Sequence, residues 1–215
     1  LEYMNDGYDW IVDLDLSKFF DNVNQDILMI LVHKVIKDPD VESLVRRFLQ
    51  SGVLVEGAFV ETKVGTAQGS PISPLLANIY LNEFDKELES RELHFTRYAD
   101  DCIICVKSEM AANRVMASIT KWLEEHLRVQ VNVAKTKVTR PNDIKYLGHS
   151  FYFKENQWRP KPHLKSVNKL KYKLVPLLRR NWGVAMEYRI KKINEVTRGW
   201  INYFRICDMK TVMMK

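Results

Sequence analysis

The chain has 215 residues, of which 46% are hydrophobic and 28% charged, and its formal net charge is +6. A chain of this length buries a sizeable core without disulfides or a structural metal, and the composition is typical of a globular protein rather than a disordered one. No apolar run approaches the roughly 20 residues of a membrane-spanning helix, and there is no N-terminal signal pattern. The three cysteines cannot form the disulfide framework of a small secreted domain. These features predict a cytoplasmic protein with no membrane partner.

The charge is divided unevenly along the chain. Residues 1–134 carry 13 Lys and Arg against 22 Asp and Glu, whereas residues 135–215 carry 20 against 5. Fixed negative charge attracts cations, and fixed positive charge attracts a polyanion such as nucleic acid. We therefore expect cation binding in the first part and nucleic-acid binding in the second.

The hydrophobic pattern predicts an α+β protein with an antiparallel sheet and helices packed on one face. The expected elements in chain order are a strand (10–16), two helices (27–35 and 41–49), a hairpin (53–64), a helix (75–89), two strands (94–98 and 102–106), a helix (109–127) and short strands (129–133 and a pair within 144–153, with a turn at Gly148). A boundary follows at Pro160 and Pro162. Two Lys- and Arg-rich helices come after it, over about 163–181 and 185–205.

Two adjacent carboxylates, Asp100 and Asp101, fall in the expected turn between two strands. Crowded like charges need a positive partner, and carboxylate oxygens suit Mg²⁺. Taken alone, the pair is better explained by the local hydrogen bonds that Asp makes in turns. Asp15, on the same face of the first strand as Asp13, shifts the interpretation from a structural turn toward a metal site. If the two strands are neighbours, Asp15 meets Asp100 with Asp101 at the rim, as a two-metal phosphoryl-transfer site requires.

A loop with two Gly and two Pro covers residues 65–74. Glycine permits close backbone approach to a ligand, Gln68 offers a donor and an acceptor, and Ser70 or Ser73 can cap the following helix. Taken alone, the loop is better read as one that simply begins a helix.

Three segments, in order, resemble successive palm motifs of reverse transcriptases: Asp15-Leu-Ser-Lys-Phe-Phe20, Gln68-Gly-Ser-Pro-Ile-Ser-Pro and Arg97-Tyr-Ala-Asp-Asp. The segment from Asn132 to Lys137 resembles the next motif, and Leu147 and Gly148 match the primer grip that follows. Gly199-Trp-Ile-Asn-Tyr-Phe resembles the thumb or maturase segment of group II intron-encoded proteins.

The resemblance implies a reverse-transcriptase palm followed by a basic helical thumb. Asp15, Asp100 and Asp101 match the catalytic carboxylates that hold two Mg²⁺ ions in the active complex. The main-chain carbonyl of Leu16 is implied as a further metal ligand.

The resemblance also implies the residues that contact the nucleotide. Phe20 matches the bulky residue that rejects a 2′-hydroxyl on the incoming sugar, and Gln68 and Gly69 match the loop that lines the nucleotide and template. Lys135 or Lys137 matches a lysine that donates a proton to the pyrophosphate, and the sequence does not choose between them.

We predict a palm over residues 1–158 and a helical thumb with the start of a maturase region over 159–215. Trp200, Tyr203 and Phe204 are expected in the thumb core. Basic side chains follow phosphates, and the residues expected to bind nucleic acid are Lys161, Lys165, Lys169, Lys173, Arg179 and Arg180.

The implied function is RNA-directed DNA polymerisation, in which deoxynucleoside triphosphates extend a DNA or RNA primer on an intron RNA template. Family members carry a fingers region before the first aspartate, and only 14 residues precede Asp15 here. We therefore expect the isolated chain to be weakly active or inactive. The alternative is a non-catalytic, RNA-binding maturase module that assists intron RNA folding and splicing. The sequence does not reveal the oligomeric state.

Cys102 and Cys105 have the spacing of a CxxC motif but lie in an expected strand. Side chains at i and i+3 of a strand point to opposite faces. These residues are therefore predicted to be small buried hydrophobes rather than a zinc or redox site.

Overall fold

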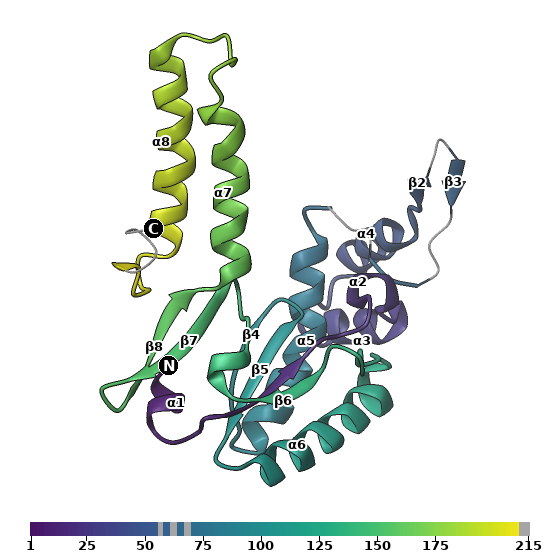
Figure 1. Ribbon diagram of the computed structural model, residues 1–215. Coiled ribbons are helices and arrows are strands. Elements are labelled where there is room, and N and C mark those ends of the chain that lie inside the picture. Colours follow the sequence, from purple (N-terminus) through teal and green to yellow (C-terminus); the bar gives the residue numbers. More distant parts are fainter. Residues whose placement is uncertain (56–57, 61–63, 67–69, 211–215) are drawn as a thin grey trace. The chain divides into compact units, whose positions relative to one another are not determined.

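The computed structural model in Figure 1 describes residues 1–55, 58–60, 64–66 and 70–210, with the backbone alone for 53–55 and 58–60. The chain forms two compact units. We call residues 7–139 the sheet unit, and residues 1–6 with 140–215 the helical-hairpin unit. The predicted palm–thumb boundary after residue 158 stays a prediction.

The sheet unit is built on a four-stranded antiparallel sheet in the order β4-β5-β1-β6. Its strands are β1 (Trp10–Leu14), β4 (His94–Tyr98), β5 (Asp101–Val106) and β6 (Lys137–Thr139). The strand at the start of the chain therefore lies directly beside β5, as expected from the sequence. A separate hairpin pairs β2 (Val53–Val55) with β3 (Ala58–Val60).

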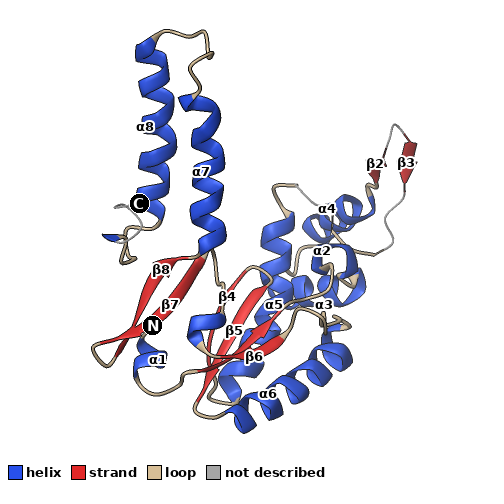
Figure 2. Cartoon of the chain, viewed as in Figure 1, coloured by secondary structure: helices blue, strands red, loops and turns tan. Residues whose placement is uncertain are grey.

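Helices cover one face of this sheet, which confirms the predicted α+β class (Figure 2). Side chains on alternate positions of β1 and β5, including Val12 and Ile104, share one buried cluster with Tyr80 and Phe84. The helices are α2 (Phe19–Asn22), α3 (Gln25–Val35), α4 (Pro39–Gln50), α5 (Ser73–Ser90) and α6 (Glu109–Trp122), with a π-helical turn at Leu123–Leu127.

Polar side chains begin three of these helices. Asn24, Asp38 and Ser108 each accept a hydrogen bond from a backbone N–H of the first turn, which satisfies donors that a helix leaves unpaired. Both cysteines of the CxxC spacing are buried and unbonded, and burial raises the pKa of Cys102 to about 12. They are the buried small side chains that the sequence predicted.

The helical-hairpin unit pairs β7 (His149–Lys154) with β8 (Gln157–Pro162) and then continues into α7 (Leu164–Leu178) and α8 (Met186–Tyr203). It also contains α1 (Glu2–Asn5) and a 3-10 turn at Pro141–Asp143. The two basic helices were predicted, and neither contains a buried residue. No helix in the described part of the chain is long and apolar enough to cross a membrane.

Two segments differ in detail from the sequence expectations. Residues 157–162, which include Pro160 and Pro162, form β8, a strand of a two-stranded hairpin, where proline is tolerated because the outer edge needs no donor. The expected strand over 129–133 makes only a single bridge, from Val131 to Leu16.

Candidate active site

The antiparallel register of β1 and β5 brings the acidic segments to one end of the sheet. Asp13 faces Ile103 and Leu14 faces Cys102, so the adjoining residues Asp15 and Asp101 lie at the same end of the sheet. Tyr98 of β4 pairs with Asp101 of β5, which leaves Ala99 and Asp100 as the turn between them. Residues separated by 85 positions in the sequence thus share one sheet end.

A segment before β6 holds the backbone of Asp15 in place. The Asp15 N–H donates to the hydroxyl of Thr136 at 3.1 Å, and the Asp15 carbonyl accepts from the N–H of Asn132 at 2.8 Å. Leu16, whose side chain is buried, bridges to Val131. The end of β1 is therefore fixed through its backbone, while the carboxyl group of Asp15 stays partly exposed.

Asp13, in β1, is a fourth acidic residue near this end of the sheet, and sequence reasoning assigned it no role. Its pKa is raised to about 6, chiefly because burial disfavours the charged carboxylate. Lys137 acts in the opposite direction, and the charges of Asp101 and Asp15 add to the increase. The period-two pattern of β1 was the signal for this residue, because it already placed Asp13 on the face of Asp15.

The two candidate lysines face different carboxylates. Lys135 Nζ lies 3.3 Å from Asp15 Oδ2, whereas Lys137 lies opposite Asp13 in the β1–β6 register. The Lys135 side chain is 66% exposed, so this ion pair contributes little to stability. Its geometry nevertheless singles out Lys135 as the lysine beside the residue predicted to be catalytic.

No three His, Cys, Asp or Glu side chains within residues 1–55, 58–60, 64–66 and 70–210 are gathered so that they could hold a metal ion. Asp15, Asp100 and Asp101 share a sheet end without forming such a group. The negative charges gathered at this end of the sheet still suit the binding of a hard cation. Asp15 and Asp101 add to the raised pKa of Asp13, and an ammonium group already lies at Asp15. Oxygen donors of this kind are those that Mg²⁺ prefers.

Phe20 and the loop after β3 are tied together through their backbones. The N–H of Thr66 donates to the Phe20 carbonyl at 2.7 Å, and the N–H of Gly65 donates to the Val23 carbonyl at 2.8 Å. Gln25 adds a side-chain hydrogen bond to the Gly65 carbonyl at 3.0 Å. The loop that leads to the predicted nucleotide contacts therefore starts against α2. Gln68 and Gly69 themselves lie outside the described residues.

We expect Gly65→Ala to destabilise the protein more than Gly7→Ala in urea denaturation. Both glycines have a positive φ, of +85° and +89°, so each replacement costs about 1–2 kcal/mol for the left-handed backbone. A Cβ at Gly65 would also lie 2.6 Å from the Asp21 carbonyl oxygen, whereas a Cβ at Gly7 meets nothing within 4 Å. Equal losses of unfolding free energy would contradict the close approach of the loop to α2.

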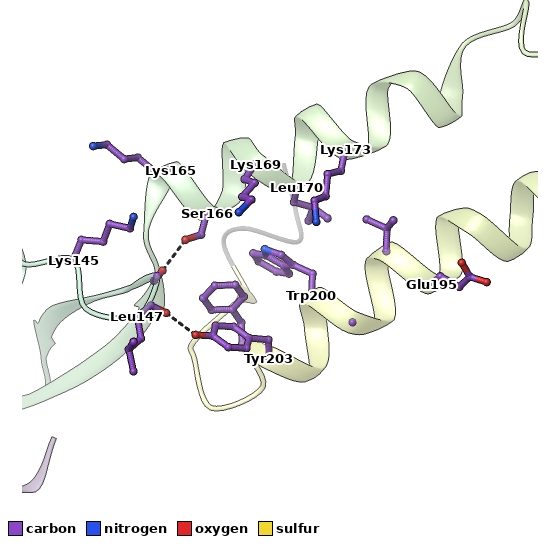
Figure 3. Close-up of a pocket in the computed structure, with 14 residues that line it drawn as sticks. Lys145, Leu147, Lys165, Ser166, Lys169, Leu170, Lys173, Glu195, Trp200 and Tyr203 are labelled. Atoms are coloured by element: carbon purple, nitrogen blue, oxygen red, sulfur yellow. Dashed lines mark hydrogen bonds between the residues drawn. The ribbon is translucent and has the colours of Figure 1, made fainter. Parts of the chain in front are cut away.

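The predicted primer grip is a tight turn in the helical-hairpin unit. Leu147 and Gly148 both have a positive φ, of 48° and 81°. At Gly148 this conformation causes no strain, because glycine has no Cβ. The Leu147 carbonyl accepts from the Tyr203 hydroxyl at 2.8 Å, and the Gly148 carbonyl accepts from the Ser166 hydroxyl at 2.9 Å (Figure 3). Side chains of α7 and α8 thus fix this turn.

Three of the six predicted nucleic-acid contacts line one cavity of about 800 Å³ beside this turn. Lys165, Lys169 and Lys173 repeat every four residues along α7, which places them on one helix face, and Lys145 joins them. Figure 3 shows Lys169 and Lys173 pointing from α7 toward α8 and Trp200. The cavity therefore combines clustered positive charge with an aromatic wall.

The other three predicted contacts lie away from the cavity lining. Lys161 belongs to β8, and its ammonium group lies 5.6 Å from the ring centre of Tyr152, whereas Arg179 and Arg180 follow the end of α7. The expectation of a buried aromatic core was correct for Phe204, which is 4% exposed, and wrong for Tyr203, which is 56% exposed. Two packed helices are too few to enclose every apolar side chain between them.

Comparisons with known proteins agree with the motif order. Residues 3–151 match the family described as reverse transcriptase (RNA-dependent DNA polymerase). Residues 167–215 match the group II intron, maturase-specific domain.

Two curated relatives show how far the likeness extends. The chain is 30% identical over 184 residues to protein YkfC of Escherichia coli strain K12, covering 69% of this chain and 48% of that protein. It is 38% identical over 97 residues to the group II intron-encoded protein LtrA of Lactococcus lactis subsp. cremoris, covering 45% of this chain and 16% of that protein. The chain thus spans less than half the length of either relative.

Solved structures show a likeness of fold alone. Telomerase from Candida albicans, in complex with a fragment of telomeric RNA, superposes with a TM-score of 0.58 at 15% identity over 91% of this chain and 39% of that chain. Apo telomerase from Candida tropicalis gives a TM-score of 0.59 at 14% identity, over 91% and 42%.

Proposed function

We propose that this chain, which belongs to the reverse transcriptase (RNA-dependent DNA polymerase) family and carries a group II intron maturase-specific domain, contains the nucleotidyl-transfer site of an RNA-directed DNA polymerase. The substrates are deoxynucleoside triphosphates, a DNA or RNA primer and an intron RNA template. The observation that carries the proposal is the register of β1 and β5, which pairs Leu14 with Cys102 and so brings the adjoining residues Asp15 and Asp101 to the same end of the sheet. RNA binding alone needs no carboxylates at this place.

In this proposal, Asp15, Asp100, Asp101 and the carbonyl of Leu16 would hold two Mg²⁺ ions. Ions bound there would activate the attacking 3′-hydroxyl and stabilise the leaving pyrophosphate. Lys135, whose ammonium group lies 3.3 Å from the Asp15 carboxylate, acts as the general acid that protonates the pyrophosphate. Phe20 restricts the sugar, from a half-buried position on α2 that the Thr66 backbone fixes.

Asp100→Ala should lower primer extension at least ~10²-fold in the full-length gene product that contains this chain, because a predicted metal ligand is lost. Single-turnover extension of a labelled primer on an RNA template measures the rate. Asp26→Ala is the matched control, because that carboxylate is 84% exposed on α3. Normal extension by Asp100→Ala would sink the polymerase role of Asp100.

Lys135→Gln should reduce the extension rate more than Lys137→Gln does, by roughly 10² if proton donation limits the reaction. The reason is that Lys135 contacts Asp15, whereas Lys137 lies opposite Asp13. Single-turnover primer extension under one set of conditions measures the rates of both variants and of the wild type. A larger loss for Lys137→Gln would assign the proton to the other lysine.

The basic helical-hairpin unit favours a second function, RNA binding that assists intron RNA folding and splicing. Its match to the maturase-specific domain and its cavity lined by four lysines support this candidate. The two functions are compatible. Splicing assistance that survives Asp100→Ala would show that they coexist on one chain.

The triple variant Lys165→Gln, Lys169→Gln, Lys173→Gln should bind intron RNA with a weaker salt dependence. Each phosphate contact on a single strand contributes roughly 0.7 to the slope of log affinity against log salt, so the slope should fall by about 2. Filter binding at several salt concentrations measures it. Lys171→Gln is the control on the same helix, outside the cavity lining. If Lys171→Gln lowers this slope as much as each cavity lysine does, the RNA binds a diffuse basic surface instead of the cavity.

The cellular compartment stays a prediction. We predicted a cytoplasmic protein, and one relative, from Marchantia polymorpha, is described as a mitochondrial protein. The compartment of such proteins therefore differs among relatives.

A further inference from the structure

The turn between β4 and β5 contains a residue in an unfavourable backbone conformation. Ala99 has a φ of 54°, in the left-handed region that residues with a Cβ rarely adopt. It stands directly before Asp100, so the peptide that joins them sets the direction in which Asp100 leaves the turn. A strained residue persists only where its surroundings hold it in place.

Arg97 provides the side-chain contact to this peptide. Its Nη1 donates to the Ala99 carbonyl at 2.8 Å, and the same nitrogen donates to Asn78 Oδ1 at 3.1 Å. The guanidinium also forms a two-pronged ion pair with Asp85, through Nε to Oδ1 at 2.6 Å and through Nη2 to Oδ2. Four hydrogen bonds thus hold one planar group in a single orientation.

The other end of this network is anchored in the core. Asp85 and Asn78 both lie on α5, seven residues apart and therefore on one face of the helix. The same helix buries Tyr80 and Phe84 completely. The Arg97 side chain is itself only 10% exposed. A rigid path therefore runs from the core, through α5 and Arg97, to the Ala99 carbonyl.

A purely structural ion pair would explain only part of this arrangement. Asp85 alone suffices to connect β4 with α5, and that connection needs no bond to the turn. The bond to the Ala99 carbonyl serves the turn instead. If the Ala99–Asp100 peptide rotated, this hydrogen bond would break and the Asp100 side chain would change direction.

We propose that Arg97, held by Asp85, is a positioning residue for nucleotidyl transfer that fixes the Ala99–Asp100 peptide and so aims the Asp100 carboxylate. This inference rests on the proposed function. It assigns no contact with substrate to Arg97. Lysine cannot replace Arg97 here, because an ammonium group lacks the planar fork that reaches Asp85 and the Ala99 carbonyl together.

The test uses four variants of the full-length gene product: Arg97→Lys, Asp85→Asn, the exchange Arg97→Asp with Asp85→Arg, and Arg91→Lys. Arg91 is the matched control, because it pairs with Glu87 on the same helix. For each variant we would measure the urea midpoint, the affinity for Mn²⁺ alone by electron paramagnetic resonance, and kcat and KM for primer extension.

Arg97→Lys should lower kcat about 10²-fold, the loss expected when a reacting group is misplaced by about 1 Å, with KM for the primer–template within about twofold. Its Mn²⁺ affinity should fall about tenfold, and Asp85→Asn should change kcat and Mn²⁺ affinity in the same direction. The exchange should recover the urea midpoint, because the ion pair is restored, but not kcat or Mn²⁺ affinity, because no guanidinium then reaches Ala99 from position 97. Arg91→Lys should match the wild type.

Two results would overturn the inference: wild-type Mn²⁺ affinity in Arg97→Lys, or full recovery of kcat and Mn²⁺ affinity in the exchange. The second result would reduce Arg97 to a structural partner of Asp85. A wild-type protein that binds Mn²⁺ without extending primers would instead sink the polymerase proposal. The Mn²⁺ affinities of the variants would still decide whether Arg97 aims Asp100.

Discussion

The structure depends on the register between β1 and β5. Along β1, Val12 and Leu14 enter the helix-covered core and are at most 1% exposed, while Asp13 and Asp15 occupy the alternate positions. A slip of one residue would exchange the two sets and bury both carboxylates among apolar side chains. The hydrophobic core thus disfavours a one-residue slip and keeps Asp13 and Asp15 on the face opposite the helix-covered core.

The acidic end is held on both sides through hydrogen bonds to its own main chain. On one side, Thr136 and Asn132 bond the backbone of Asp15. On the other side, Arg97 bonds the carbonyl that precedes Asp100. These bonds fix the positions of Asp15 and Asp100 through the main chain, and the Arg97 guanidinium that makes one of them is paired with the Asp85 carboxylate. Preorganisation of this kind is how active sites stabilise charge at small reorganisation cost.

The sequence predicted the parts that depend on local periodicity. The alternation of β1, the helical spacing of α5 and the Lys-rich composition of α7 each identified an element near its observed position. The sequence posed the adjacency of β1 and β5 as a condition for bringing Asp15 and Asp100 together, and the structure meets this condition. The pairing of β7 with β8 was missed, since Pro160 and Pro162 in β8 resemble a boundary when the edge position of the strand is unknown.

Contacts between distant residues were beyond sequence reasoning. Arg97 belongs to the Arg97-Tyr-Ala-Asp-Asp motif, but its positioning role depends on its contacts with both Asp85 and Ala99, and no spacing rule connects the three. The choice between Lys135 and Lys137 likewise needed the register of β6, which sends alternate side chains to different partners. The alternation of β1 revealed the position of Asp13. Only the structure shows that burial and the charge of Asp101 raise the pKa of Asp13.

The central proposal is that Asp15 and Asp100 bind the same divalent ions although they lie 85 positions apart in the sequence. A titration of the full-length protein with Mn²⁺ by electron paramagnetic resonance tests it, comparing Asp15→Asn, Asp100→Asn and the double variant. Residues that share one site act together, so each single change should remove the same high-affinity ions and the double change should remove no more. Independent, additive losses from two separate sets of ions would contradict the account.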